Sequence, residues 1–169
     1  LPAALAGIRT GLLPPALACE EKWCMLFSEP SGGSDLGNAR TTARREGDHY
    51  IVNGQKIWNS LAHVAQIGVL VARTDSTVPK HQGLSQFIID MNTPGVTVRP
   101  IIDMSGEENE YNEVFFEDVR IPADRLLGKE GDGWRITMEQ LQTERQHMTN
   151  PGAVWGGGPT ARELVGGLI

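Results

Sequence analysis

Cysteine is scarce in this 169-residue chain, with only Cys19 and Cys24 present. Their spacing matches no Cys-x-x-Cys metal or redox motif, and two thiols do not build a disulfide framework. A reducing compartment is therefore the default expectation.

The chain also lacks the short motifs of several common enzyme classes. The four histidines are scattered, with no His-Glu-x-x-His pattern, so we expect no metal site; they are His49, His63, His81 and His147. No Walker A sequence occurs, and no Gly-x-Gly-x-x-Gly follows a first strand, so no nucleotide is held in the Rossmann manner. Gly32–Leu36 begins like a nucleophile elbow but ends on leucine, and the chain offers no α/β sheet to carry one.

Basic charge and long apolar runs are missing too. Lys plus Arg number 15 against 21 Asp plus Glu, a net charge of -6, which disfavours nucleic acid or an anionic membrane surface as the main partner. No apolar run reaches membrane-spanning length, and no signal segment opens the chain. The start at Leu1-Pro2 and the end without a polar tail are typical of a fragment, which we expect to be inactive alone.

Glycine and proline are plentiful, with 20 and 10 residues, and indicate many turns. Short apolar or alternating runs between turn signals predict seven or eight strands, the spacing of a sandwich or barrel. The fold class is therefore mainly β, a β-barrel or sandwich middle domain with flanking α-helical segments, α+β overall. The expected strands cover residues 23–27, 41–45, 49–52, 55–58, 67–72, 84–91, 96–99 and 113–119.

Local signals refine this plan. Asn53-Gly54 is the strongest hairpin signal, a two-residue type I′ turn between 49–52 and 55–58. A short helix over 3–13 is expected to end at Pro14-Pro15. Asp132 is a good N-cap for a helix whose apolar face runs from Trp134 to Met148, and a further helix is possible over 160–169. We predict domains at 1–22 (end of a helical region), 23–122 (β domain) and 123–169 (start of a second helical region).

Two loops combine an aromatic residue with small hydroxyls. Phe27–Asp35 breaks at Pro30 and passes two glycines, which permit close approach or a positive φ, so its N–H groups form an anion cradle of the nest type. Trp58–Ser60 follows another predicted strand, and an indole beside a hydroxyl suits a flat heteroaromatic ring. Two plainer interpretations stay open: an ordinary loop with Ser34 or Asp35 capping a helix at Leu36, and Trp58 as a core residue.

The run from Trp23 to Asp35 resembles the flavin-binding strand and loop of the acyl-CoA dehydrogenase family, and Gly54–Ser60 is similar to its second flavin-contacting segment. The resemblance continues, in the family's order, through 72–75, 93–96, 112–119 and 131–134. It implies a β-barrel between two helical domains, FAD, usually a homotetramer, and α,β-dehydrogenation of an acyl-CoA thioester in fatty acid metabolism. Electrons then pass to an electron-transfer flavoprotein. The compartment implied is the bacterial cytoplasm, or the mitochondrial matrix in a eukaryote.

The resemblance also assigns roles residue by residue. The segment expected along the flavin and its pyrophosphate includes Met25, Leu26, Phe27, Ser28, Gly33 and Ser34, with Ser28 at the flavin edge. Ser34 matches a position that also contacts the acyl-CoA. Trp58 packs against the isoalloxazine, Asn59 lies beside it, and Ser60 stands for a hydroxyl, often threonine, that bonds to N5. Ser31-Gly32-Gly33 replaces the commoner Gly-Ala-Gly.

The catalytic base has two candidate positions in the family. One is a glutamate beyond Ile169, and the other immediately precedes an arginine on the helix that begins this chain's last segment, where Glu144-Arg145 stands. A solvated charge on an amphipathic helix is the alternative for Glu144. Arg145 resembles an arginine that contacts the nucleotide part of FAD or substrate, with a helix-surface arginine as the alternative. An acyl-CoA oxidase or flavin monooxygenase on the same scaffold, and a catalytically silent β module, stay open.

Overall fold

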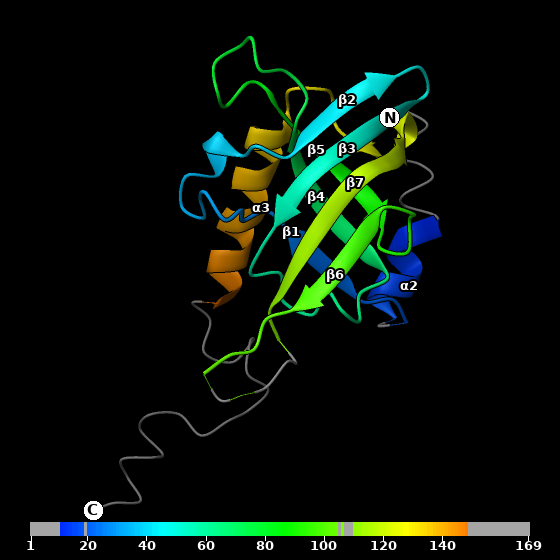
Figure 1. Ribbon diagram of the computed structural model, residues 1–169, viewed down its shortest axis with the longest axis vertical. Helices are drawn as coiled ribbons and strands as arrows, with labels where there is room; N and C mark the ends of the chain where they lie inside the picture. Colours follow the sequence, from blue (N-terminus) through cyan, green and yellow to red (C-terminus); the bar gives the residue numbers. More distant parts are fainter. Residues whose placement is uncertain (1–10, 19, 105, 107–109, 149–169) are drawn as a thin grey trace, which may run out of the picture. The chain divides into compact units, whose positions relative to one another are not determined.

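A β-sheet of eight strands dominates the computed structural model, which describes residues 11–18, 20–104, 106 and 110–148 (Figure 1). The prediction of a mainly β fold with helical segments is confirmed. The strands are β1 (Trp23–Leu26), β2 (Thr42–Glu46), β3 (His49–Lys56), β4 (Ile67–Arg73), β5 (Leu84–Asp90), β6 (Val96–Pro100), β7 (Asn112–Pro122) and β8 (Leu126–Leu127). The described α-helices are α2 (Leu13–Leu17) and α3 (Gly133–Met148), with 3₁₀ turns at Leu36–Asn38 and Ala123–Arg125.

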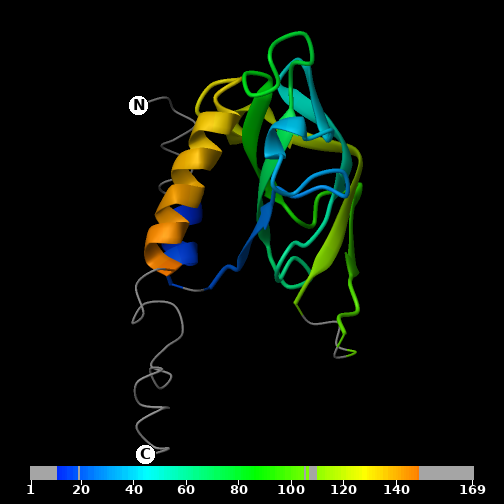
Figure 2. The same cartoon turned by 90° about the vertical axis from the view of Figure 1, so that its left-hand side faces the viewer.

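The strands follow the order β6-β7-β3-β2-β4-β5-β8, and β1 pairs with β4 in parallel. Most neighbours run antiparallel, and Figure 1 shows β3 between β2 and β7. Among the described strands β6 and β8 are the two ends of this order and do not pair, so the sheet is not closed. Figure 2 shows the sheet curling, with β6 and β7 on the side opposite β1.

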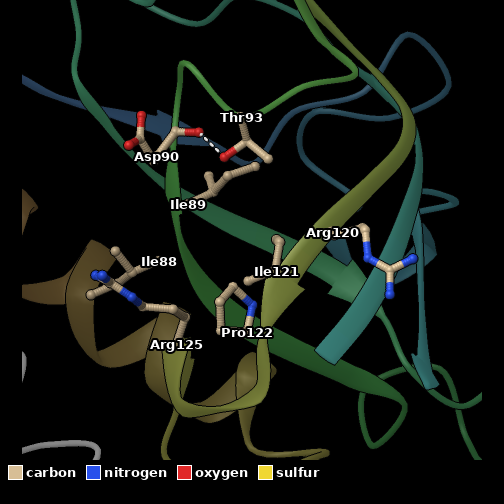
Figure 3. A pocket seen from close by; sticks show the side chains of 8 residues that line it. All are labelled: Ile88, Ile89, Asp90, Thr93, Arg120, Ile121, Pro122 and Arg125. Atoms are coloured by element: carbon tan, nitrogen blue, oxygen red, sulfur yellow. Dashed lines mark hydrogen bonds between the residues drawn. The ribbon is translucent and has the colours of Figure 1, made fainter. Parts of the chain in front are cut away.

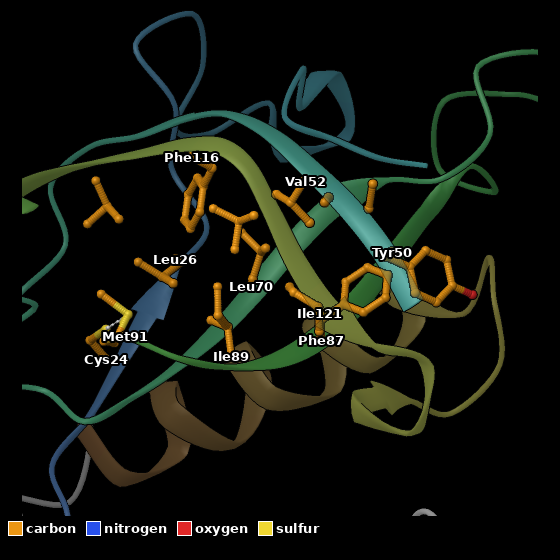
Figure 4. Close-up of a cluster of buried hydrophobic side chains, with 14 of the residues drawn as sticks. Cys24, Leu26, Tyr50, Val52, Leu70, Phe87, Ile89, Met91, Phe116 and Ile121 are labelled. Atoms are coloured by element: carbon orange, nitrogen blue, oxygen red, sulfur yellow. Dashed lines mark hydrogen bonds between the residues drawn. The ribbon is translucent and has the colours of Figure 1, made fainter. Parts of the chain in front are cut away.

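The core lies inside this curl, because alternate residues of each strand point the same way. Leu70 of β4 and Phe87 of β5 are fully buried there, and the Phe87 ring meets the Tyr50 ring edge-on with centroids 4.8 Å apart. Figure 4 shows the cluster, whose labelled members are Cys24, Leu26, Tyr50, Val52, Leu70, Phe87, Ile89, Met91, Phe116 and Ile121. The opposite faces of β4 and β5 send Ile67 and Ile88 into a smaller cluster.

The hairpin predicted at Asn53-Gly54 is wrong. β3 runs unbroken through both residues, and the turn lies earlier, at Gly47-Asp48, where Gly47 has φ +62° and joins β2 to β3. Asn53-Gly54 forms an irregularity opposite β7, where the Asn53 side chain exchanges two 2.9 Å hydrogen bonds with Asp118. The extra residue of this irregularity lies in β7, since Val52 faces Val119 and Gly54 faces Phe116, so the Asn-Gly dipeptide stays inside an extended strand.

The expectation that Pro14-Pro15 ends a helix is also wrong. Both prolines stand in the first turn of α2, and the Pro14 carbonyl accepts a hydrogen bond from Ala18 N at 3.0 Å. Proline fits there because the first helical N–H groups have no intrahelical acceptor anyway. Most of the helix predicted over 3–13, and all of that over 160–169, lies outside the described residues.

By its contacts the chain divides into two compact units, Leu1–Trp134 and Arg135–Ile169. Helix α3 begins directly after Asp132, at the end of the first unit, and continues in the second. The domain boundaries proposed from the sequence stay predictions. Neither α-helix of the described part of the chain has the length and apolar character needed to cross a membrane.

Candidate functional site

Two loops that the sequence singled out lie against each other. The serine–glycine loop (residues 27–35) follows β1, and the tryptophan loop (residues 57–61) follows β3. The Ile57 N–H donates to the Ser28 carbonyl at 3.0 Å, and the Asn59 side-chain amide donates to the Met25 carbonyl at 2.8 Å. These bonds cross from one loop and its strand to the other, so the two loops lie side by side in the fold.

Trp58 is exposed and conformationally unusual. Its φ is +62° and 58% of the residue is accessible, so the interpretation as a core residue does not hold. Leu61 shares a positive φ, +59°, and is 47% exposed. The Trp58 ring meets Tyr111 edge-on, with centroids 6.1 Å apart. A bulky residue held at positive φ is strained, and such strain gathers at functional sites.

Asn59, in contrast, is buried and anchors the tryptophan loop from beneath. Its N–H donates to the Asn112 carbonyl at 3.1 Å, and the Asn112 side-chain amide returns a 2.9 Å bond to the Asn59 carbonyl. The side-chain oxygens of both asparagines are buried without a hydrogen-bond partner among the described residues. Buried acceptors usually find a donor, so the base of this loop keeps two unused acceptors.

The serine–glycine loop opens with a tight turn. Glu29 and Gly32 exchange two backbone hydrogen bonds, of 3.0 and 3.1 Å, across Pro30-Ser31. Neither Gly32 nor Gly33 has a positive φ, so the loop does not use its glycines for a left-handed backbone. At Gly33 a Cβ would have Ser28 Oγ, at 3.9 Å, as its nearest neighbour, so the space over this residue is open. The backbone at Gly33 is therefore open to close approach.

The loop ends in the short helical turn that the plainer interpretation expected at Leu36. Asp35 occupies its N-cap position without a side-chain bond to the backbone. Its carboxylate instead accepts from Lys80 Nζ at 2.8 Å and from the Asn38 amide at 2.5 Å. The hydrogen bond from Lys80 is the main reason that the pKa of Asp35 lies below its usual value.

A basic hollow of about 440 Å³ adjoins this turn. Arg40, Arg73 and Lys80 line it together with Asn38, Ala39, Ser76 and Val78. Arg73 donates to the carbonyls of Gly37 and Ala39, at 2.7 and 3.0 Å, which holds its guanidinium in place. Positive charge fixed beside a glycine loop favours an anionic ligand.

A buried ion pair that no sequence motif indicated joins Glu29 of the serine–glycine loop to Lys56, directly before the tryptophan loop. Lys56 Nζ is 2.8 Å from Glu29 Oε1, with side-chain exposures of 0% and 4%. Burial lowers the pKa of Lys56 to about 8, against the opposing effect of Glu29. Burial alone would raise the pKa of Glu29, but Lys56 and the N–H groups of Arg40 and Thr41 outweigh it, so this pKa is lowered. Glu29 and Lys56 are 27 residues apart, so no local sequence motif predicts that they pair.

The lowered pKa of Glu29 predicts a specific acid dependence of stability. A carboxyl whose folded pKa lies below its ordinary value of 4.5 stabilises the fold above that pH, and the contribution is lost as pH falls through the folded pKa. We expect urea unfolding between pH 6 and 2 to show the stability gap between wild type and Glu29→Gln shrinking toward acid. A gap independent of pH would contradict this.

The residues predicted to contact the flavin or the substrate differ in their exposure. Leu26 and Phe27 are buried and offer only backbone to a ligand, whereas Met25 on the outer side of β1 is 40% exposed. Ser28 is half-buried, and Ser34 and Ser60 are exposed.

Glu144 and Arg145 lie on α3 in the second compact unit. Their roles stay predictions, as do those of the loop residues.

Another pocket, of about 270 Å³, opens at a different part of the sheet (Figure 3). It is lined by Ile88, Ile89, Asp90, Thr93, Arg120, Ile121, Pro122 and Arg125, none of which the sequence singled out as a site residue. None of these residues belongs to the serine–glycine loop or the tryptophan loop, so this pocket is separate from the candidate site.

Metal and thiol chemistry find no support in the part of the chain that the structure describes. Within it no three His, Cys, Asp or Glu side chains group as metal ligands. Burial raises the pKa of the Cys24 thiol to about 12, which keeps it protonated and unreactive at neutral pH.

Comparison with known proteins matches residues 24–119 to the family model described as acyl-CoA dehydrogenase, middle domain. The chain is 46% identical over 133 residues to acyl-CoA dehydrogenase IpdE1 of Mycobacterium tuberculosis, covering 79% of this chain and 34% of that protein. It is 42% identical to the human mitochondrial short-chain specific acyl-CoA dehydrogenase, over 72% of this chain and 30% of that one. The crystal structure of an acyl-CoA dehydrogenase from Geobacillus kaustophilus superposes with a TM-score of 0.76 at 38% identity, over 81% of this chain and 37% of the other. The chain thus spans about a third of the length of these relatives.

Proposed function

The chain belongs to the acyl-CoA dehydrogenase family and matches its middle domain, and on this basis we propose that it supplies the flavin- and acyl-CoA-binding part of an FAD-dependent dehydrogenase. The proposed reaction is α,β-dehydrogenation of an acyl-CoA thioester. One observation carries the proposal: Trp58, an exposed indole at positive φ, stands on a loop hydrogen-bonded to the serine–glycine loop.

The residues present fit a flavin nucleotide. The indole of Trp58 offers a flat apolar face to a tricyclic ring, and the open space over Gly33 admits close approach to the backbone. The basic hollow beside Asn38 suits phosphate groups. Within this proposal, the backbone of residues 25–28, the Asn59 segment and the hydroxyls of Ser28 and Ser60 line the flavin edge.

Bound FAD supplies the acceptor for the hydride that leaves the substrate β-carbon. The protein must remove the α-proton, and a carboxylate is the fitting base. Glu144 is the candidate within this chain, and a glutamate outside it is the alternative. Ser34 and Arg145 are proposed to hold the acyl-CoA, and Arg145 also the cofactor.

The proposal extends to partners and compartment. Electron-transfer flavoprotein is the proposed electron acceptor, and a homotetramer the proposed assembly. Relatives include a bacterial and a mitochondrial protein, so the bacterial cytoplasm, or the matrix in a eukaryote, is the proposed location.

The decisive experiment is anaerobic titration of the FAD-loaded full-length protein with short, long and branched acyl-CoAs. Bleaching of the flavin absorbance by one of them supports the proposal. Reoxidation compared between oxygen and an electron-transfer flavoprotein then separates a dehydrogenase from an oxidase. A flavin that no acyl-CoA reduces would favour a silent binding module, and no flavin binding at all would overturn the proposal.

Trp58→Ala is expected to weaken FAD binding about 10- to 100-fold, because it removes the aromatic face proposed to cover the ring. Stability to urea changes little, since Trp58 is largely exposed. Flavin retained after gel filtration, and FAD affinity by fluorescence quenching, are the measurements. Trp58→Phe is the matched control and keeps part of the affinity. An unchanged flavin absorbance ratio in Trp58→Ala would count against the role.

A further inference from the structure

The buried Lys56–Glu29 pair stands at the point where the two loops leave the sheet. Lys56 is the last residue of β3, directly before the tryptophan loop, and Glu29 begins the tight turn of the serine–glycine loop. Besides its 2.8 Å contact with Glu29, Lys56 Nζ donates to the Phe27 carbonyl at 3.0 Å. The Lys56 ammonium group therefore bonds to both a side chain and a backbone carbonyl of the serine–glycine loop.

The carboxylate of Glu29 is itself fully engaged. Oε2 accepts the Arg40 N–H at 2.6 Å, and Oε1 accepts the Thr41 N–H at 2.9 Å in addition to Lys56. Three chain segments thus converge on this carboxylate: the turn at 29–32, the end of β3, and the residues that lead into β2. Charge-assisted bonds of this kind are directional and short, and they fix orientation.

The pair sets the relative position of two proposed cofactor residues. Beside the bond from Lys56 to Phe27, the Ile57 N–H bonds to the Ser28 carbonyl at 3.0 Å. Each loop is therefore clamped at two successive residues, and Trp58 is the next residue beyond the clamp. For stability alone, two apolar side chains of similar volume would serve as well as a buried ion pair. The charged pair also forms directional hydrogen bonds, and these can hold the residues of a site in one fixed geometry.

We propose that Glu29 and Lys56 are positioning residues that clamp the serine–glycine and tryptophan loops in one fixed relation, so that Ser28 and Trp58 are presented together to the cofactor. This inference rests on the proposed function, because it assigns the clamp to the same FAD site. Neither side chain touches the cofactor in this scheme, since both are buried behind the loops. A merely structural pair would support folding and leave the bound flavin unaffected.

The test uses the double variant Glu29→Gln/Lys56→Met in the full-length protein, which removes both charges together and leaves no unpaired ion. Its control is Arg44→Met/Glu46→Gln, which removes an exposed ion pair of β2, 2.5 Å long, with side-chain exposures of 71% and 38%. The readouts are hydrogen exchange at the Ile57 amide without cofactor, FAD affinity, and the visible spectrum at saturating FAD.

For the double variant we expect faster exchange at Ile57, FAD binding weakened about 10-fold or more, and a shifted flavin spectrum, with the control unchanged in all three. If wild type binds FAD and the double variant matches it in affinity and spectrum, the clamp is overturned while the proposed function stands. A wild type that binds no FAD overturns both. Loss of affinity with an unshifted spectrum and unchanged Ile57 exchange also overturns the clamp, because the loops would then have kept their relation.

Discussion

Lys56→Met is expected to destabilise the fold by about 3–5 kcal/mol, the cost of leaving one charge of a buried pair without its partner. The Lys56 side chain is completely buried, and its removal leaves the Glu29 carboxylate, 4% exposed, with only backbone N–H donors. Methionine fills much the same volume, so the loss reports charge rather than packing. Urea unfolding at neutral pH measures it.

Two variants make the Lys56 result interpretable. Arg44→Met breaks the exposed pair with Glu46 and should cost under about 1 kcal/mol. Glu29→Gln/Lys56→Met should recover most of the stability lost by Lys56→Met, because the unpaired carboxylate is gone. If Lys56→Met and Arg44→Met proved equally mild, the pair would not be buried as described.

Gly54→Ala is expected to cost about 2–3 kcal/mol, because the position has no room for a methyl group. A Cβ there would lie 2.7 Å from Thr41 Cα, and this neighbour is backbone that cannot turn aside. The φ of +150° adds strain for any residue with a side chain. Since Thr41 N also bonds to Glu29, the displacement would reach the ion pair.

Gly47→Asn is the matched control for Gly54→Ala. Gly47 forms the β2–β3 turn with φ +62° and has nothing within 4 Å of an added Cβ, and asparagine tolerates that backbone. Thermal unfolding should show a small shift for Gly47→Asn and a large one for Gly54→Ala. The reverse order would restore the turn predicted from the sequence at Asn53-Gly54.

The sequence predicted those elements whose signal is local. The continuous apolar runs of β4 and β5 are long enough to form central strands and were placed to within a residue or two. Asn53-Gly54 misled because this dipeptide is typical of a hairpin turn, and only the pairing with β7 shows that the strand continues through it. Lys56 lies on the same face of β3 as the buried Tyr50 and Val52, as the strand's alternation requires.

Local sequence signals also predicted part of the candidate site. The two loops could be named from their residues, but the sequence left open whether Trp58 lies in the core or at the surface. Its exposure depends on a positive φ that tertiary hydrogen bonds impose, such as those of Asn59 and Ile57. Neither Glu29 nor Lys56 stands out in the sequence, because a glutamate before proline and a lysine in a strand are usually solvated.

The parallel pairing of β1 with β4 also bears on when the site is assembled during folding. The hairpins β2–β3, β4–β5 and β6–β7 join strands that are neighbours in sequence, so their closure costs little chain entropy. β1 instead pairs with β4, which follows the β2–β3 hairpin in the sequence, so that Trp23 lies opposite Ile67. Such non-local contacts form slowly. The serine–glycine loop follows β1 directly, so we expect it to acquire its shape late in folding, after the hairpins have formed.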